Sequence, residues 1–153
     1  MPDVGDRAPE FSLQSTRGEV RLSELTAESR VLLAFYTEDF TPLCSNEVSV
    51  LKADFEIVDS LRTKVLAISA DTLESHEQFE ESLGGLPFPL ASDEHLTAAE
   101  AYGVVDDGEK RSRRAVFVIE KGGEITHAEP WFQPSNPSQY EEIFRALGFD
   151  AAD

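Results

Sequence analysis

The sequence predicts one α/β domain in which helices cover both faces of a β-sheet. Its 153 residues are enough for one compact domain and too few for two. Strand-like runs alternate with segments of helical periodicity, and the last two strand-like runs are close enough to form a hairpin. We therefore expect residues 1–153 to fold as a single domain.

The predicted strands are apolar runs rich in β-branched and aromatic residues. They cover residues 31–36, 65–70, 115–120 and 124–127. A lysine and two glycines at residues 121–123 separate the last two runs, and such a connection suits a hairpin. Residues 11–13 and 20–22, on either side of Gly18, predict a small hairpin ahead of the first long strand.

The strongest helical pattern covers residues 46–61, where apolar residues recur at helical spacing with charged residues between them. A second helix is expected at residues 75–83, because Ser75 can cap it and Gln78 follows three residues later. The glycines at residues 84–85 would end it. Two further helices, each followed by a glycine, are expected at residues 97–102 and 138–147.

The chain is strongly acidic. Thirty Asp and Glu residues against thirteen Lys and Arg give a formal net charge of −17. That field repels nucleic acids and anionic membranes, so we expect neither as a partner. Only four of the basic residues are lysines, and an excess of Asp and Glu with few lysines is typical of proteins that work in concentrated salt. An ordinary acidic protein is an equal alternative at this point.

We expect a cytoplasmic protein. No run is long and apolar enough to span a membrane. The first seven residues lack the basic segment and apolar stretch that begin a secretory signal. One cysteine cannot form an internal disulfide, which is typical of a reducing compartment.

That cysteine, Cys44, is a candidate nucleophile. It follows the predicted strand 31–36 after a short polar loop and lies at the start of the predicted helix 46–61. A thiolate at a helix N-terminus faces unpaired backbone N–H groups and the positive end of the helix dipole. These surroundings lower the pKa of a cysteine and favour the reactive thiolate. The alternative is a buried cysteine that acts as a small inert hydrophobic residue.

The histidines do not predict a metal site. His76, His95 and His127 are dispersed, and none has a partner at metal-ligand spacing. No flavin, haem or nucleotide motif is visible, so we expect no cofactor. His76, in the predicted helix 75–83, is interpreted as a surface or packing residue.

The segment 39–44, together with Glu47, resembles the active-site signature of the peroxiredoxins of the alkyl hydroperoxide reductase/thiol-specific antioxidant (AhpC/TSA) family. That signature has Thr or Ser three residues before the cysteine, as Thr41 is here, and a proline seven residues before it, where this chain has Thr37. The resemblance implies a thioredoxin-like fold, with a central mixed β-sheet flanked by helices and an N-terminal hairpin extension. Further segments resemble the family in the same order: residues 4–11, 75–79, 88–93, 101–104 and 114–119.

The resemblance implies a thiol-dependent peroxidase in which Cys44 attacks a hydroperoxide and becomes a sulfenic acid. It implies that the Arg114 guanidinium favours the thiolate and orients the peroxide, and that the Thr41 hydroxyl holds the sulfur or the peroxide. Backbone N–H groups at Leu43 and Cys44 would stabilise the leaving oxygen. Glu47, one helical turn after the cysteine, is expected to brace the arginine.

The choice of arginine and the residue at position 37 both depend on the family pattern. Arg113 and Arg114 precede the predicted strand 115–120, and strand alternation points them to opposite faces. Alternation does not choose between them; the family pattern, with arginine three residues before Phe117, chooses Arg114. At Thr37, the missing proline ring is expected to leave the loop less rigid and the thiolate more hydrated.

The resemblance also suggests the partners. Ser49 stands where some relatives of the bacterioferritin comigratory protein branch carry a second cysteine. Without it, an external thiol must reduce the sulfenic acid. The chain thus resembles a one-cysteine type of that branch, with a hydroperoxide substrate and a thioredoxin-like protein or low-molecular-weight thiol as reductant. A homodimer is suggested by family analogy alone.

Two other interpretations stay open. A redox sensor or interaction protein of the same fold would oxidise at Cys44 and signal through a mixed disulfide, with little turnover. A structural relative would keep the fold with an inert cysteine. The absence of a CxxC pair disfavours a thioredoxin-type disulfide reductase.

The acidic composition makes a prediction about salt. If the chain is adapted to concentrated salt, its thermal midpoint rises steeply with KCl, because added ions screen the repulsion among its acidic side chains. Thermal unfolding followed by circular dichroism from low to molar KCl measures this. A flat midpoint would leave an ordinary acidic protein.

Overall fold

The computed structural model describes residues 2–106, 110–133 and 136–148, with the backbone alone for residues 42–44 and 46. Its strands are β1 (Ser12–Ser15), β2 (Gly18–Arg21), β3 (Arg30–Phe35), β4 (Thr63–Ser69), β5 (Leu90–Ser92), β6 (Val105–Asp106), β7 (Arg111–Ser112), β8 (Ala115–Ile119) and β9 (Ile125–Glu129). Its helices are α1 (Leu22–Glu28), α2 (Pro42–Ala53), α3 (Phe55–Ser60), α4 (Leu73–Ser82), α5 (Thr97–Tyr102) and α6 (Pro137–Ala146).

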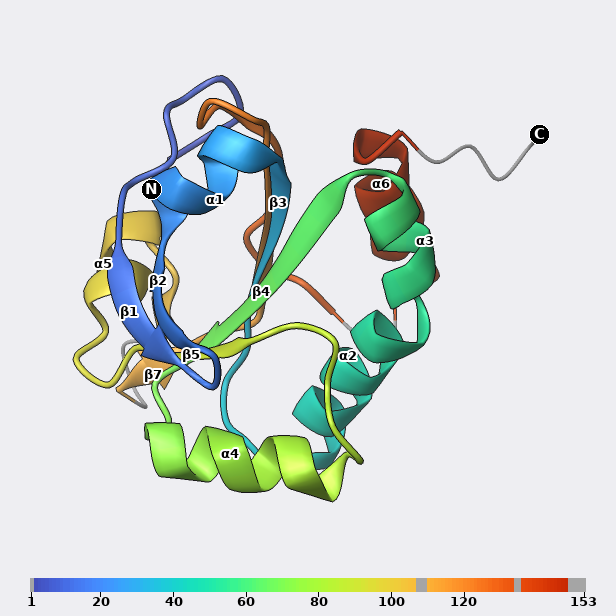
Figure 1. Cartoon of the computed structure of the whole chain (residues 1–153). Coiled ribbons are helices and arrows are strands. Elements are labelled where there is room, and N and C mark those ends of the chain that lie inside the picture. The colour runs from blue at the N-terminus through green and yellow to red at the C-terminus, as the bar shows by residue number, and fades with distance from the viewer. Residues whose placement is uncertain (1, 107–109, 134–135, 149–153) are drawn as a thin grey trace.

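A seven-stranded mixed sheet with the order β2-β1-β5-β4-β3-β8-β9 forms the centre. Strand β4 runs parallel to β3 and β5, while β8 pairs with β3 and β9 in antiparallel fashion. Helices α2, α3 and α6 cover one face, and α1 and α5 cover the other (Figure 1). The predicted α/β sheet with helices on both faces is confirmed.

Strand β3 supplies both core layers because its side chains alternate between the two faces. Leu32 and Ala34 pack toward α2 and α6. Val31, Leu33 and Phe35 pack toward α1 and α5, in a layer that also contains the rings of Tyr102 and Phe117. A strand buried on both faces reads as a continuous apolar run, which is why the sequence located β3, β4 and β8 well.

The long predicted helix 46–61 is wrong at its start and in its middle. The structure begins α2 at Pro42, because proline suits the first helical position, where its missing N–H is not needed. Asp54, with φ −95° and ψ 5°, leaves the helical region, and α3 starts after it. Cys44 is therefore the third residue of α2 instead of the residue ahead of the helix.

Several shorter elements were also missed or displaced. The opening hairpin pairs Ser12–Ser15 with Gly18–Arg21 and is followed at once by α1, which the sequence analysis did not predict. The strands β5, β6 and β7 have only two or three residues, too few for a periodic signal. Helix α4 starts at Leu73 with Thr72 as its cap, and Ser75 donates its backbone N–H to the Thr72 hydroxyl instead of capping the helix itself.

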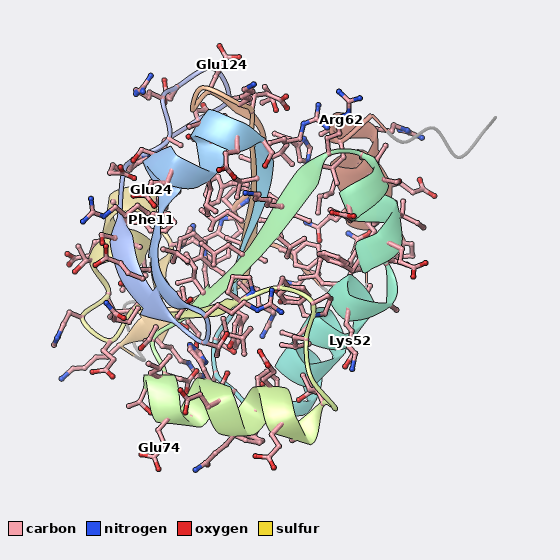
Figure 2. The ribbon with its side chains drawn as sticks, viewed as in Figure 1. Phe11, Glu24, Lys52, Arg62, Glu74 and Glu124 are labelled. Atoms are coloured by element: carbon pink, nitrogen blue, oxygen red, sulfur yellow. The ribbon has the colours of Figure 1, made fainter. Side chains whose placement is uncertain are left out.

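Many charged side chains lie at the surface, as those of Glu24, Glu74 and Glu124 do in Figure 2. In the part of the chain that the structure describes, no helix has the length and apolar character needed to cross a membrane.

Phe117 gives a test of the core. It is fully buried on β8, with ring centroids 6.1 Å from Phe35 and 5.2 Å from Tyr102. Phe117→Ala should lower the free energy of unfolding by about 3–5 kcal/mol, because it removes apolar contacts and leaves a cavity. The control Ile57→Ala truncates a side chain that is 39% exposed on α3 and should cost less than about 1 kcal/mol. Urea unfolding measures both, and similar losses would contradict this core assignment.

Candidate functional site

The candidate site lies where β3 ends and the chain turns into α2. Strands β3 and β4 are parallel, so their C-terminal ends lie at the same edge of the sheet. Strand β8 runs the opposite way and begins at that edge, with Ala115 beside Phe35. Loops that follow parallel strands therefore meet the residues that precede β8, and this brings distant parts of the sequence together.

The loop ends in Thr41, whose extended backbone, φ −75° and ψ 145°, precedes the first turn of α2. The carbonyl of Thr41 accepts the first helical hydrogen bond, from the Ser45 N–H at 2.8 Å, and its hydroxyl donates to the Glu38 carbonyl at 3.2 Å. The first N–H groups of any α-helix lack intrahelical acceptors, and those of Leu43 and Cys44 are among them here. The Leu43 and Cys44 side chains lie outside the described residues.

The two candidate arginines have different surroundings. Arg113 donates from Nε to the Pro130 carbonyl at 2.7 Å, and its guanidinium lies 3.9 Å from the Trp131 ring centroid. Alternation from Val116 on β8 puts Arg114 on the sheet face that α2 covers. The Nε of Arg114 is buried and makes no hydrogen bond to the residues that the structure describes. A buried donor without a partner is uncommon in proteins and needs an explanation.

Glu47 lies inside the molecule beneath α6. It is 1% exposed and lines a small cavity together with apolar side chains such as Leu51 and Phe132. Tyr140 of α6 lines the same cavity, and its buried hydroxyl has no hydrogen-bond partner among the described residues. Burial, followed by the negative charges of Glu47 and Asp54, raises the pKa of Tyr140 to about 12. The contact between Glu47 and the arginine stays a prediction.

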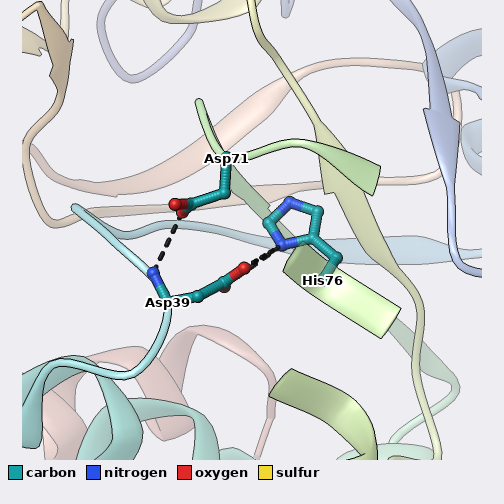
Figure 3. A group of neighbouring side chains, drawn as sticks. All are labelled: Asp39, Asp71 and His76. Atoms are coloured by element: carbon teal, nitrogen blue, oxygen red, sulfur yellow. Dashed lines mark hydrogen bonds and ion pairs between the residues drawn. The ribbon is translucent and has the colours of Figure 1, made fainter. Parts of the chain in front are cut away.

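Asp39 and His76 form a buried network that the sequence analysis missed. His76 is fully buried, and its Nδ1 lies 2.8 Å from Oδ2 of Asp39 (Figure 3). The Asp39 carboxylate also accepts from the Tyr36 hydroxyl at 2.6 Å and from the Ser75 hydroxyl at 2.8 Å. Of the two interpretations of His76, as a surface or a packing residue, the first is therefore wrong and the second agrees with its burial. His76 and Phe79 are three residues apart on one face of α4, and that spacing is the signal that could have placed His76 toward the core.

Two clusters have the atoms to bind a metal ion. Ligand atoms of Asp39, Asp71 and His76 lie within 4.8 Å of one another. Both carboxylates in this cluster already accept hydrogen bonds from protein groups. Asp71 accepts from the Ser69 hydroxyl and from the Asp39 backbone N–H, the second of which is drawn in Figure 3. We therefore interpret this cluster as a hydrogen-bond network.

The second cluster, His127, Glu129 and Glu142, is on the surface between β9 and α6. A hydrogen bond with Glu129, and then its charge, raises the pKa of Glu142. The three groups lie outside the loop that leads to Cys44. Exposed acidic clusters of this kind are common without an ion.

Tyr140 yields a prediction with a definite sign. Its pKa is about 12 in the folded chain against an ordinary value near 10, so folding favours the neutral phenol. This contribution to stability is complete below about pH 10 and is lost as the pH rises toward about 12. Tyr140→Phe should therefore lose less stability than the parent over that range. At neutral pH it should be equal to the parent or up to about 1 kcal/mol more stable, because the hydroxyl has no described partner.

Urea unfolding at several pH values measures this difference, with ionisation followed by tyrosine absorbance. A Tyr140→Phe variant that loses stability in parallel with the parent would contradict the assignment.

Similarity to known proteins agrees with this geometry. The sequence matches the AhpC/TSA family over residues 4–128. It is 30% identical over 138 residues to the chloroplastic 2-Cys peroxiredoxin BAS1 of Hordeum vulgare, covering 84% of this chain and 66% of that protein. It is 31% identical over 134 residues to a protein of Coxiella burnetii named as a peroxiredoxin, bcp, covering 84% of this chain and 88% of that one.

Solved structures show the same fold. Peroxidoxin BcpB from Mycobacterium tuberculosis superposes with a TM-score of 0.85 at 25% identity, over 95% of this chain and 96% of that one. A yeast mitochondrial 1-Cys peroxiredoxin also gives 0.85 at 25% identity, over 97% of this chain and 77% of that one. The predicted thioredoxin-like fold is confirmed.

The chain spans only 52% to 66% of the length of the plant relatives that it matches. Relatives near 30% identity include both bcp and 2-Cys types, so the similarity does not select a branch. It does cover the loop, the start of α2 and the residues before β8, all within the matched range. The chain belongs to the AhpC/TSA family of peroxiredoxins.

Proposed function

We propose that this chain is a thiol-dependent peroxidase that reduces hydrogen peroxide or organic hydroperoxides through Cys44. The observation that carries the proposal is the position of Cys44 in the first turn of α2, at the sheet edge where Arg114 presents a buried Nε without a described partner. Free helix N–H groups and a guanidinium both stabilise negative charge. A thiolate, and the oxygen that leaves a peroxide, are the two negative charges of this reaction.

The reaction proceeds in two balanced steps. The Cys44 thiolate attacks one peroxide oxygen, the O–O bond breaks, and the cysteine becomes a sulfenic acid while the other oxygen leaves as hydroxide or alkoxide and takes up a proton. Arg114 and the N–H groups of Leu43 and Cys44 stabilise the leaving oxygen, and the Thr41 hydroxyl holds the peroxide. An external thiol then forms a disulfide with Cys44 and releases water, and a second thiol frees the cysteine.

We further propose a one-cysteine mechanism of the bacterioferritin comigratory protein type. Cys44 is the only cysteine of this sequence, and Ser49 stands where a second one occurs in some relatives. The reductant would then be a thioredoxin-like protein or a low-molecular-weight thiol. In support, the yeast 1-Cys relative is described as resolving its thiol through glutathione and thioredoxin systems. The cytoplasmic location and the homodimer stay predictions.

The second candidate function is a redox sensor, and Thr37 is the observation that favours it. Threonine in place of the family's proline leaves the loop ahead of Cys44 less constrained. A sensor would form the sulfenic acid but would not be reduced rapidly and repeatedly.

The peroxidase proposal predicts a fast reaction with peroxide. Stopped-flow mixing of the reduced protein with hydrogen peroxide, followed by Trp131 fluorescence, should show oxidation several orders of magnitude faster than that of a free thiol. Cys44→Ser should abolish it, and mass spectrometry should find one added oxygen at Cys44. Arg114→Lys should slow oxidation on the order of tenfold to a hundredfold, because lysine cannot reproduce the planar fork.

Arg113→Lys is the matched control. Arg113 is the neighbouring arginine, held by Pro130 and Trp131, and its replacement should leave the rate within about twofold of the parent. Because this change alters the surroundings of Trp131, the two arginine variants are compared by quenched mass spectrometry. A parent rate similar to that of free cysteine would overturn the peroxidase proposal. Fast oxidation without turnover in the presence of thiols would favour the sensor.

A further inference from the structure

Asp39 and His76 make a buried pair whose hydrogen bonds define its protonation. The two side chains are 1% and 0% exposed. Nδ1 of His76 lies 2.8 Å from Oδ2 and 3.1 Å from Oδ1 of Asp39. Nε2 lies 2.9 Å from the carbonyl oxygen of Ala91 on β5. Nδ1 also lies 3.2 Å from the Tyr36 hydroxyl, but that hydroxyl donates its one hydrogen to the closer Oδ1 of Asp39 at 2.6 Å. Each ring nitrogen therefore faces an acceptor.

Counting hydrogens shows that the pair holds an extra proton. A carbonyl oxygen can only accept, so Nε2 of His76 carries a hydrogen. With no hydrogen on Nδ1, its lone pair would oppose the lone pairs of the Asp39 carboxylate in a site closed to water, which is costly. Hydrogen bonds from Tyr36 and Ser75 already favour the ionised carboxylate, so the proton belongs on the imidazole.

Other titratable groups nearby are compatible with this charge distribution. Tyr36, from the end of β3, and Asp71, which follows β4, face the pair. Burial, and after it the charge of Asp39, raises the pKa of Tyr36 well above its ordinary value, so Tyr36 stays a neutral donor. Helix α4 contributes Ser75, which is neutral, and β5 contributes only the Ala91 carbonyl.

The pair holds the loop that leads to Cys44. The Asp39 backbone N–H donates to Asp71 at 3.0 Å while its side chain contacts α4 (Figure 3). The next residue, Phe40, has a positive φ of 68° and packs its ring 5.2 Å from that of Phe79, also on α4. Two consecutive loop residues are thus tied to α4, and only Thr41 separates them from the first turn of α2.

We propose that Asp39 and the protonated His76 form a buried ion pair that positions Cys44 by holding residues 37–41 against α4. The proposal rests on the proposed use of Cys44 as a thiolate, because it concerns the backbone that leads into the first turn of α2, where Cys44 lies. Neither residue touches the reacting atoms, so both are positioning residues. A displaced loop would disorder the first turn of α2, and the free N–H groups of that turn would then stabilise the thiolate less well.

The charge state is tested on the unmodified protein by ¹⁵N NMR of the histidine rings. Both ring nitrogens of His76 should show imidazolium shifts at neutral pH, with the exposed His95 as internal reference. One unprotonated ring nitrogen on His76 at neutral pH would overturn the ion pair. In Asp39→Asn, which removes the negative charge at nearly constant size, Nδ1 of His76 should lose its proton at neutral pH.

The positioning role is tested by the pH profile of Cys44 alkylation with iodoacetamide, which reports the thiolate fraction. In His76→Phe and Asp39→Asn the midpoint should move upward by roughly half a pH unit or more, because the thiolate is less well placed. His95→Gln is the matched control on the surface and should leave the midpoint unchanged. A purely structural pair would lower the thermal midpoint without moving the alkylation profile, and that result would overturn the positioning role.

These experiments separate the two proposals. Alkylation needs no peroxide turnover, so slow oxidation of the parent by hydrogen peroxide would overturn the peroxidase proposal alone. An unmoved alkylation profile with fast oxidation would overturn only the positioning role. If His76→Phe does not fold, Asp39→Asn and the NMR spectrum of the parent still decide the result.

Discussion

The parallel pairing of β3 with β4 is the constraint on which the rest of the site depends. It places the ends of both strands at one edge of the sheet, and the antiparallel β8 begins at the same edge. Residues far apart in sequence thereby meet without any long-range signal in their own segments, as Asp39 meets Asp71 and Ala115 meets Phe35. Because these strands are buried on both faces, a slip in their register would disrupt the packing of both core layers, and the edge is therefore held in place.

A rigid sheet edge can fix the position of Cys44 only if the loop between the edge and that residue is also held in place. Residues 37–41 form a short connection, and such loops are usually the mobile part of a fold. Here the connection is tied on two sides. Arg111 contacts Glu38 at 2.8 Å from the β7 side, and Asp39 is bound to α4 through Ser75 and His76. Helix α4 carries none of the residues expected to react, yet it contacts the loop that leads into α2 through Asp39 and Phe40.

Much of the fold could be predicted from sequence because its central strands are long apolar runs. The end of α5 could be predicted because Gly103, with φ 70°, follows it directly. The elements that were missed are those whose identity comes from tertiary pairing. The three residues of β5 form a strand only because Ala67 and Ile68 of β4 lie beside Leu90 and Ala91. The prediction of one long helix at residues 46–61 was wrong because Asp54 separates α2 from α3 within a continuous periodic pattern.

The site was predicted only as far as local spacing reaches. Thr41, Cys44 and Glu47 share one segment, and their spacing was sufficient to place them at the start of a helix. The partner of His76 is 37 residues away in sequence, so no local pattern could reveal it. When Asp39 is not known to lie beside it, His76 is naturally interpreted as a packing residue next to Phe79. That interpretation agrees with the burial of His76 but misses its hydrogen bond with Asp39.

The net charge of −17 and the chemistry proposed at Cys44 act over different distances. Exposed acidic side chains are screened beyond roughly 8–10 Å at ordinary ionic strength, so their field is felt mainly at the surface. In the proposed site the stabilising groups are the buried guanidinium of Arg114 and the positive end of α2, which act at short range. A neutral hydroperoxide is not repelled by the surface field and meets only the short-range groups. An acidic surface and a thiolate-stabilising site are therefore compatible in one chain.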